Sequence, residues 1–521
     1  MLNVIQFPIR RLFIGLESVF DGPFGPAWNP IRQLGTMAFY FFWISAVSGI
    51  YVFILFDTSV SGAYESVEYM THEQWFLGGI MRSLHRYASD AMVACMILHC
   101  VREFSMDRYR GARWFTWLTG VPVIWFLLVS GISGYWLVWD ELAQYLAIGS
   151  MEWIDWLGIF GKSVAENFLT RGSLDDRFFS LLVFMHIFAP LFLLFVMWIH
   201  ILRVSRARTN PPRGLAIGSF LMLLGLAFAY PALSHGPADL GLVPSSLNLD
   251  WYFMAFYPLF DHFGAGTLWA LGFGGSLFLC LMPWLPPLQR KQAPEVFLEQ
   301  CNGCTRCFED CPYSAITMQP RTDGRPFERE AVVNSDLCTS CGICVGSCPM
   351  STPFRRGGAL ETGIDLPELP LDQVHERITG AIGRAKKSAP ANQPSLLVIG
   401  CDHGAAVNHF SGDGLGAVSL PCIGMLPPSF LDFALSGNRV DGVMLTGCAQ
   451  CDCHHRLGIQ WTEERLTGLR DPYLRKRVPR DRLDVFWAAS SEGPELEREV
   501  EEFKSRLKQI DASDTSEKVG S

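Results

Sequence analysis

Six apolar runs in the first half of the 521-residue sequence constrain its fold more than any other feature. A helix needs roughly 20 apolar residues to cross a ~30 Å hydrocarbon core. Mean hydropathy is +0.21, and only 18% of the residues are charged, which is unusual for a wholly soluble chain. The runs cover residues 33–56, 78–101, 115–139, 178–202, 215–233 and 266–285. We therefore expect an all-α bundle of six transmembrane helices.

Charged residues between the runs predict the orientation of this bundle. One side carries Arg10, Arg11, Arg32, Arg102, Arg108, Arg110, Arg113, Arg203, Arg206, Arg208, Arg213, Arg290 and Lys291. The other side carries Asp57, Glu65, Glu68, Glu73, Asp140, Glu141, Glu152, Asp155, Asp239, Asp250 and Asp261. Basic residues gather on the cytoplasmic side of membrane proteins. We expect a multi-pass protein of the inner (cytoplasmic) membrane with both termini in the cytoplasm. The first 20 residues read as an amphipathic interfacial segment rather than a secretory signal.

Four histidines lie inside these runs at one repeated spacing. His85 and His99 share the second run, His186 and His200 share the fourth, and each pair is 14 residues apart. On a helix this spacing is about 21 Å of rise, roughly 40° short of four turns, so both imidazoles face one side. His85 with His186, and His99 with His200, could each ligate one haem iron, giving an outer and an inner haem. The alternative, four histidines that merely satisfy polar helix contacts, explains the matched spacing poorly.

Glycines and arginines support the same interpretation. Gly35 and Gly49 in the first run, and Gly120 and Gly134 in the third, repeat the 14-residue interval. Glycines there would let a flat macrocycle approach the backbone, although ordinary helix packing through small residues is the alternative. Arg82 and Arg102 are candidate partners of haem propionates, and Arg102 also fits the orientation pattern.

Together with these positions, three segments resemble the cytochrome b of bc-type quinol oxidoreductases, over about residues 1–290. They are GYWLVW at 134–139, NFLTRGSLDDRFF at 167–179 and LDWYFMAFY at 249–257. The resemblance implies two b haems, a quinone or quinol substrate, and a dimer within a larger complex.

The segment at 249–257 contains a candidate quinone site. In the resembling family this stretch lies in an outer loop beside the quinol oxidation site, where its acidic residue accepts a proton. The family's Pro-Glu is Leu249-Asp250 here, so the resemblance implies a catalytic role for Asp250 with Tyr252 nearby. Asp is one methylene shorter than Glu, and a solvated loop acid is the alternative.

Thirteen of the 16 cysteines fall between residues 301 and 453. Eight form two C-x2-C-x2-C-x3-C-P runs, a spacing that wraps 4Fe–4S clusters, with the fourth cysteine of each run ligating the other cluster. One cluster would take Cys301, Cys304, Cys307 and Cys348, and the other Cys338, Cys341, Cys344 and Cys311. Zinc is a weak competitor because structural zinc sites usually separate two close pairs by a longer spacer. Residues 291–356 are similar to bacterial-type two-cluster ferredoxins of the α+β class.

Short strands and helices alternate after a linker with a helix at 357–394, which predicts a small parallel α/β domain at 395–510. Strands are expected to end at Cys401, Cys422 and Cys448, with helices near Ala405, from about Pro428, from about Thr462 and from Glu495 to about Ile510. Carboxyl ends of parallel strands meet at one edge, so these thiols converge there with Cys451 and Cys453. Four thiolates suit a 2Fe–2S cluster or zinc, and spacing alone does not choose between them.

This domain looks like the iron–sulfur delta subunit of methyl-viologen-reducing hydrogenase. The matching text is GC at 400–401, Cys422, GCAQCDCHH at 447–455, residues 461–465, and AASSEG at 488–493. The resemblance implies a 2Fe–2S cluster on Cys401, Cys422, Cys448 and Cys453, with Cys451 as the spare thiol or a substitute ligand. It also implies transfer of electrons to a heterodisulfide-reductase-type flavoprotein. His454 and His455 would surround the cluster or, as the favoured interpretation, lie on the surface. Residues 511–521 are expected to be disordered.

These modules predict a membrane electron-transfer subunit of a quinone-linked oxidoreductase. It would connect the quinone pool with a cytoplasmic flavoprotein or dehydrogenase through one 2Fe–2S cluster, two 4Fe–4S clusters and two b haems. A bifurcating bc-type complex with a Rieske or c-type cytochrome subunit is the runner-up, and a zinc-stabilised scaffold or redox sensor is the third reading. A net charge of −9 argues against a nucleic-acid partner, and no glycine-rich nucleotide or flavin motif follows a strand.

Overall fold

The computed structural model describes residues 2–170, 173–202, 207–244, 246–285, 292–354, 360–391, 393–450 and 452–519. Arg203, Arg206, Arg290 and Lys291 of the predicted orientation pattern, and Cys451, lie outside these residues. The chain forms two compact units, one of residues 1–10 and 33–286 and one of residues 11–32 and 287–521. Helix α1 (Leu2–Phe24) contributes to both.

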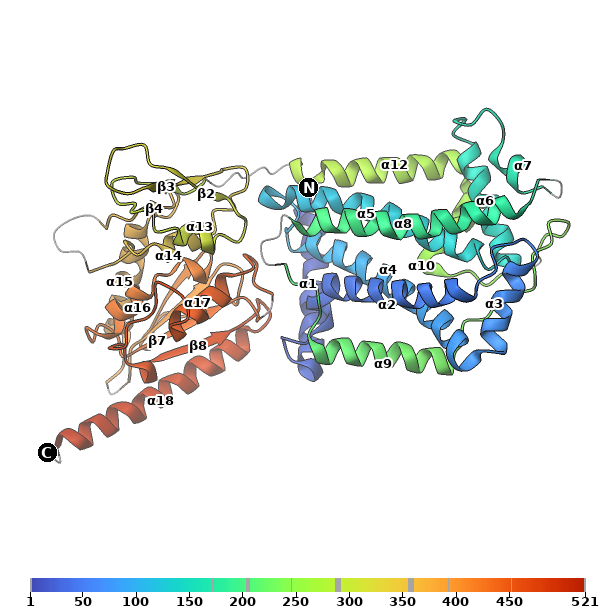
Figure 1. Ribbon diagram of the computed structural model, residues 1–521. Helices are drawn as coiled ribbons and strands as arrows, with labels where there is room; N and C mark the ends of the chain where they lie inside the picture. Colours follow the sequence, from blue (N-terminus) through green and yellow to red (C-terminus); the bar gives the residue numbers. More distant parts are fainter. Residues whose placement is uncertain are drawn as a thin grey trace. The chain divides into compact units, whose positions relative to one another are not determined.

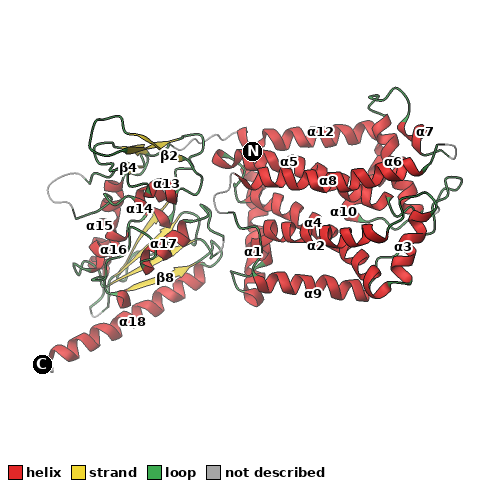
Figure 2. Ribbon diagram, viewed as in Figure 1, coloured by secondary structure: helices red, strands yellow, loops and turns green. Residues whose placement is uncertain are grey.

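The first unit is entirely helical in its described part (Figures 1 and 2). Its long helices run alongside one another: α2 (Leu34–Leu55), α4 (Ile80–Ser105), α5 (Trp114–Trp136), α8 (Asp176–Leu202), α9 (Arg213–Ala229) and α12 (Ala265–Leu281). At one end lie α3 (Gly62–His72), α6 (Glu141–Asp155) and α7 (Val164–Phe168). Two short helices, α10 (Trp251–Met254) and α11 (Tyr257–Phe263), precede α12. Helix α2 packs on α4, and α5 packs on α8.

Four of these helices are long and apolar enough to cross a membrane: Pro30–Leu55, Trp114–Trp136, Asp176–Leu202 and Ala265–Trp284. Each of the other two predicted runs also contains a helix. Helix α4 carries charged residues, among them Arg82, Arg86 and Asp90, and α9 has only 17 residues. The structure therefore supports a helical membrane region, and the number six stays a prediction.

The second unit begins with a small antiparallel module around the two cysteine runs. Strand β1 (Glu295–Val296) pairs with β4 (Ile364–Asp365), and β2 (Ile316–Pro320) pairs with β3 (Arg329–Val333). Helices α13 (Arg306–Asp310) and α14 (Ile343–Ser347) each start after a left-handed residue, Thr305 at φ 65° and Gly342 at φ 76°. Each helix ends one residue before the fourth cysteine of its run, which lets that cysteine turn away from the helix toward the other three-cysteine group.

A four-stranded parallel sheet forms the rest of this unit, in the order β6-β5-β7-β8. The strands are β5 (Leu396–Cys401), β6 (Leu415–Leu420), β7 (Gly442–Gly447) and β8 (Leu483–Trp487). Strands β5 and β7 are buried along their whole length, as expected for central strands covered on both faces. The helices are α15 (Leu371–Ser388), α16 (Pro428–Leu435), α17 (Gly458–Thr467) and α18 (Gly493–Val519).

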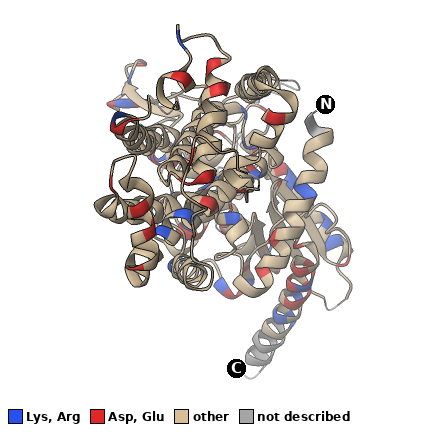
Figure 3. Cartoon of the chain, turned by 90° about the vertical axis from the view of Figure 1, so that its right-hand side faces the viewer, with Lys and Arg blue, Asp and Glu red and all other residues tan. Residues whose placement is uncertain are grey.

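Two predictions for this unit differ from the structure. The helix expected near Ala405 does not form, and turns and bends connect β5 to β6 through residues 402–414. The backbone there is used otherwise, because the Ala405 amide donates to the Ala488 carbonyl at 3.0 Å. Helix α18 continues to Val519, so the tail expected to be disordered is helical almost to its end. Acidic and basic residues both lie along this helix (Figure 3).

Candidate redox centres

His85 on α4 faces His186 on α8, as expected for two axial ligands of one iron. Their ring centroids are 6.0 Å apart and the ring planes lie at 74°. A metal bonded at about 2 Å to one nitrogen of each ring would separate the centroids by a similar distance. His99 and His200, one repeat further along the same helices, are close enough to interact electrostatically. The structure thus places His85 against His186 and brings His99 near His200, and their role as haem ligands stays a prediction.

Backbone carbonyls orient the two outer imidazoles. His85 Nδ1 lies 2.8 Å from the Ser45 carbonyl oxygen, and His186 Nδ1 lies 3.0 Å from that of Ser130. A carbonyl oxygen only accepts hydrogen bonds, so Nδ1 must carry the proton and Nε2 keeps its lone pair. This is the tautomer that a metal ligand needs.

The four predicted glycines lie directly against these imidazoles. A Cβ added at Gly49 would lie 2.7 Å from His85 Cε1, and one at Gly134 would lie 2.8 Å from His186 Cε1. For the inner pairs the corresponding distances are 3.2 Å (Gly35 to His99) and 3.4 Å (Gly120 to His200). Glycine at these positions leaves room for the imidazole rings. The sequence pattern predicts that the glycines make room for a macrocycle instead. The two histidine pairs and their glycines fit two b haems.

The two arginines expected near haem propionates have protein partners. Arg82 donates to the hydroxyls of Thr71 and Ser234, the latter at 2.8 Å. Arg102 is buried with 3% of its surface exposed, and one of its nitrogens lies 3.5 Å from Glu103 Oε1. A role toward propionates stays a prediction for both.

Asp250 is a buried residue rather than a solvated loop acid, with 9% of its surface exposed. One carboxylate oxygen caps helix α10 by accepting from the Tyr252 amide at 2.7 Å. The other accepts a hydrogen bond from the Tyr135 hydroxyl. Tyr252 and Trp251 expose 49% and 75% of their surfaces. The Asp250 carboxylate is therefore fixed beside two exposed aromatic side chains.

The first group of ferredoxin-type cysteines surrounds a small cavity. Cys301, Cys304, Cys307 and Cys348 line it together. Gly303 adopts φ 68°, and a Cβ there would lie 2.4 Å from the Arg329 carbonyl oxygen, so only glycine fits this turn. The Arg321 side chain donates a hydrogen bond to the Cys301 carbonyl at 2.7 Å and so fixes the backbone at the first cysteine of this group.

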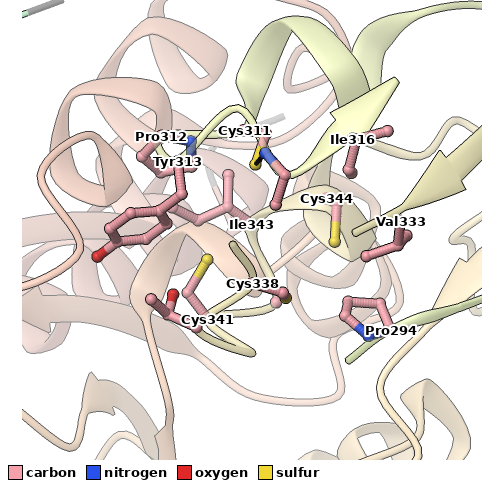
Figure 4. Close-up of a pocket in the computed structure, with 13 residues that line it drawn as sticks. Pro294, Cys311, Pro312, Tyr313, Ile316, Val333, Cys338, Cys341, Ile343 and Cys344 are labelled. Atoms are coloured by element: carbon pink, nitrogen blue, oxygen red, sulfur yellow. Dashed lines mark hydrogen bonds between the residues drawn. The ribbon is translucent and has the colours of Figure 1, made fainter. Parts of the chain in front are cut away.

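The second group surrounds another small cavity (Figure 4). Cys338, Cys341 and Cys344 line it with Cys311, so each run contributes its fourth cysteine to the other group. Backbone amides point at two of these sulfurs: Ala315 N lies 3.3 Å from Cys311 Sγ, and Ser340 N lies 3.3 Å from Cys338 Sγ. Such donors stabilise the negative charge of a thiolate-bound cluster.

Burial raises the pKa of several of these thiols. It raises the pKa of Cys307 and of Cys341 to about 12, and that of Cys344 well above its usual range. Iron must therefore displace protons from the sulfurs, so loading of the sites releases protons. The donor set, four thiols around each of two small cavities, fits 4Fe–4S clusters.

Four further cysteines converge at the carboxyl edge of the parallel sheet. Cys401 ends β5 and Cys448 follows β7, and their sulfurs are 3.7 Å apart. Cys453 is hydrogen-bonded to both Cys422 and Cys448. A Cβ at Gly458 would lie only 2.2 Å from Cys422 Sγ, so this glycine admits the sulfur group. The arrangement offers four thiolates to one metal site.

Three histidines border this thiol group. The ligand atoms of His403, His454 and His455 lie within 4.8 Å of one another, and the His454 amide donates to Cys448 Sγ at 3.4 Å. His455 exposes only 7% of its surface, so the favoured interpretation of it as a surface residue was wrong. Its Nδ1 lies 3.2 Å from the Tyr313 hydroxyl of the ferredoxin module.

A buried ion pair joins the ferredoxin module to the sheet domain. Asp310, next to Cys311, accepts from Arg465 of α17 at 2.6 Å and from Arg470 at 2.6 Å. The Trp461 indole donates to the Asp310 carbonyl at 3.1 Å. Asp310 and Arg465 expose 2% and 1% of their side chains, so neither charge has water as an alternative partner. The two modules therefore form one body with a common polar core.

Comparison with known proteins supports the assignment of the helical region. Residues 20–208 match the family model Cytochrome b/b6/petB. The cytochrome b6 of Porphyra purpurea is 32% identical over 195 residues, covering 36% of this chain and 87% of that protein. The cytochrome b6 of Prochlorothrix hollandica is 30% identical over 194 residues, covering 36% of this chain and 84% of that protein. The chain belongs to the cytochrome b/b6 family.

Two further family models match segments of the chain that follow the cytochrome b region. A 4Fe-4S dicluster domain matches residues 300–352, and the delta subunit of methyl-viologen-reducing hydrogenase matches residues 397–511. Among solved structures, the hyperthermophilic respiratory Complex III is similar with a TM-score of 0.42 and 19% identity, covering 49% of this chain and 75% of that one. Joined to iron–sulfur domains, this cytochrome b is a membrane electron-transfer subunit.

Sequence reasoning missed several residues at these sites. Asp90 and Arg86 lie beside Asp250 but were indistinguishable from other charged residues in the second apolar run. The pair formed by Asp310 and Arg465 joins residues 155 positions apart, and no local pattern signals it. His403 follows Cys401 by two residues, and that proximity was the only available signal.

Proposed function

We propose that this cytochrome b exchanges electrons between membrane quinone and a cytoplasmic flavoprotein or dehydrogenase of the heterodisulfide-reductase type. Electrons would pass through a 2Fe–2S cluster on Cys401, Cys422, Cys448 and Cys453, then through two 4Fe–4S clusters and two b haems. When bound, these groups supply one-electron chemistry, and the chain's residues position them.

One observation carries this proposal. Cys341 of the second ferredoxin-type group and Cys422 of the sheet domain belong to one buried cluster with Ile343, Leu457 and Trp461. The two sites are therefore separated by packed side chains and not by solvent. That proximity supports direct electron transfer between the two clusters. A zinc-stabilised scaffold would not require the two cysteine sites to lie this close together.

A second candidate is the cytochrome b of a bc-type complex with a Rieske partner. The buried Asp250, fixed by Tyr135 and next to the exposed Tyr252, favours a quinol site at this loop. Co-purification of a Rieske or c-type subunit would support this candidate. A flavoprotein of the heterodisulfide-reductase type in the purified complex would support the first.

Metal analysis of the complex purified with its partners tests the proposed function. We expect at least two b haems and about ten non-haem iron atoms per chain, from two 4Fe–4S clusters and one 2Fe–2S cluster, with any iron of the partner subunits in addition. Zinc in place of iron, or a reduced-minus-oxidised spectrum without haem bands, would contradict it.

A further inference from the structure

Asp90 on α4 lies beside Asp250, close enough for the two carboxyl groups to interact. Two adjacent carboxylates repel each other, so a carboxyl pair of this kind favours the state in which one of the two carries a proton. Asp90 comes five residues after His85, one of the outer haem-site ligands, and helix α10 with Asp250 packs against both α4 and α5. The pair therefore lies at the depth of the outer histidines.

Two other side chains complete this site. The Tyr135 hydroxyl donates to Asp250. Arg86, one helical turn before Asp90, lies with its guanidinium carbon 5.5 Å from the Tyr135 ring centroid. With one proton shared between the carboxyls, the pair carries one negative charge and Arg86 carries one positive charge. The cluster is then neutral, as a buried ionisable group requires.

Two buried polar atoms of this cluster have no hydrogen-bond partner within the described part of the chain. They are Asp90 Oδ1 and Arg86 Nε, an acceptor and a donor on one face of α4. Buried polar atoms in folded proteins are nearly always satisfied, by protein, water or ligand. An acceptor and a donor together suit a group that both donates and accepts, such as a hydroxyl.

We propose that Asp90 and Asp250 form a paired proton-binding site that takes the proton of a quinol hydroxyl, with Asp90 as the residue that contacts the substrate. The inference rests on the proposed quinone exchange and adds a catalytic residue to it. Oxidation of one quinol releases two electrons and two protons. The electrons pass to one-electron acceptors, of which the outer haem is one. The O–H bond next to Asp90 breaks and its proton joins the pair, while the proton that the pair already held and the second quinol proton are released to water, so the pair again carries one proton. Quinone reduction runs the same step backwards.

The test compares Asp90→Asn with wild-type protein in the intact membrane complex. Reduction of the haems by a short-chain quinol is followed by stopped-flow absorbance. We expect Asp90→Asn and Asp90→Leu to slow this reduction roughly 100-fold, the usual range for loss of a general base. Asp90→Glu should retain most of the rate. Glu65→Gln, which changes an exposed acid on α3, serves as the matched control and should leave the rate unchanged.

A spectroscopic readout separates a proton-binding role from a structural one. In redox-induced infrared difference spectra, the wild type should show a carboxylic-acid C=O band that shifts on reduction and disappears in Asp90→Asn. Haem content and the rate of reduction by dithionite should be unchanged in the same variant.

Two outcomes overturn different claims. If quinol does not reduce the haems of the wild-type protein, and quinone does not reoxidise them once they are reduced, the proposed function is contradicted. Wild-type haems that quinol reduces, together with an unchanged rate and infrared band in Asp90→Asn, would contradict the role of Asp90 alone.

Discussion

At the scale of single residues, the outer histidines are oriented by carbonyls that face them across a helix pair. His85 uses the carbonyl of Ser45 on α2, and His186 uses that of Ser130 on α5. Ser45 and Ser130 accept these hydrogen bonds through their backbone carbonyls, so substitution of either serine side chain leaves the bonds in place. Two hydroxyls lie slightly further away, with Ser45 Oγ 3.4 Å from His85 Nδ1 and Ser133 Oγ 3.3 Å from His186 Nδ1. The helix packing therefore orients both imidazoles chiefly through backbone carbonyls.

Removal of one histidine should remove one haem. In His99→Ala the inner site loses one of two axial ligands, whereas His85 and His186 keep their partners. We expect the haem-to-protein ratio to fall from two to about one in a pyridine haemochrome assay. Loss of neither haem, or of both with the helical circular dichroism unchanged, would contradict the ligand assignment.

The glycines give a graded prediction. Gly49→Ala places a Cβ 2.7 Å from the His85 ring, a contact that requires the imidazole to move, whereas Gly120→Ala gives an ordinary contact of 3.4 Å. We expect Gly49→Ala to shift or abolish the outer haem signal in low-temperature difference spectra, and Gly120→Ala to leave both signals in place. Gly218→Ala, with open space around the added atom, is the control. Equal effects of all three would contradict this role for the glycines.

Residue-level prediction from sequence succeeded where a period was repeated. The 14-residue spacing of the histidines predicted two pairs, and His85 lies against His186 in the structure. It did not reveal Asp90, because a single acid in an apolar helix has no period, and its meaning depends on Asp250, 160 positions later.

At the scale of elements, the contact between α13 and α17 holds the ferredoxin module on the sheet domain. Arg465→Met leaves the Asp310 carboxylate without its fully buried partner. Breaking a buried ion pair on one side costs about 3–5 kcal/mol. We expect a correspondingly lower denaturant midpoint for loss of the iron–sulfur absorbance. Arg498→Met, which breaks an exposed pair with Glu495, should not change this midpoint measurably. Equal midpoints for both variants would contradict the role of the pair.

The cysteines of the sheet domain give a second prediction at this scale. Cys448→Ser removes a thiol that lies 3.7 Å from Cys401, so the 2Fe–2S electron paramagnetic resonance signal should disappear. Cys451→Ser should retain it, because four thiols already converge without Cys451. Loss of the signal in Cys451→Ser and its survival in Cys453→Ser would assign the ligand to Cys451 instead.

Element-level prediction was accurate for strands and less so for their connections. The buried apolar strands β5 and β7 are recognisable because both faces must be hydrophobic. The connection after β5 is different: a Cβ at Gly404 would lie 2.2 Å from the Gly447 carbonyl oxygen, so the chain packs tightly across strand ends there. Tertiary contact, which sequence does not show, replaced the expected helix near Ala405.

At the scale of the whole molecule, two opposite compositions are joined in one chain. The charge-poor helical region belongs to the cytochrome b/b6 family, and the cysteine-rich region matches a 4Fe-4S dicluster domain and a hydrogenase delta-subunit domain. Composition and motif spacing were enough to separate a membrane region from a cysteine-rich region, and family resemblance supplied the identity of the modules. They could not predict that Cys341 and Cys422 share one buried cluster, since that depends on how the two modules pack.

The most direct test of the electron path is the rate at which a low-potential donor reduces the haems through the clusters. Reduced methyl viologen is mixed with the oxidised complex, and the haem absorbance is followed in wild type and in Cys338→Ser, which removes a ligand of the second ferredoxin-type group. We predict rapid haem reduction in the wild type and at least a roughly tenfold slower rate in the variant, with its haem content unchanged. Equal rates in the two proteins would contradict the claim that the iron–sulfur domains supply the haems with electrons.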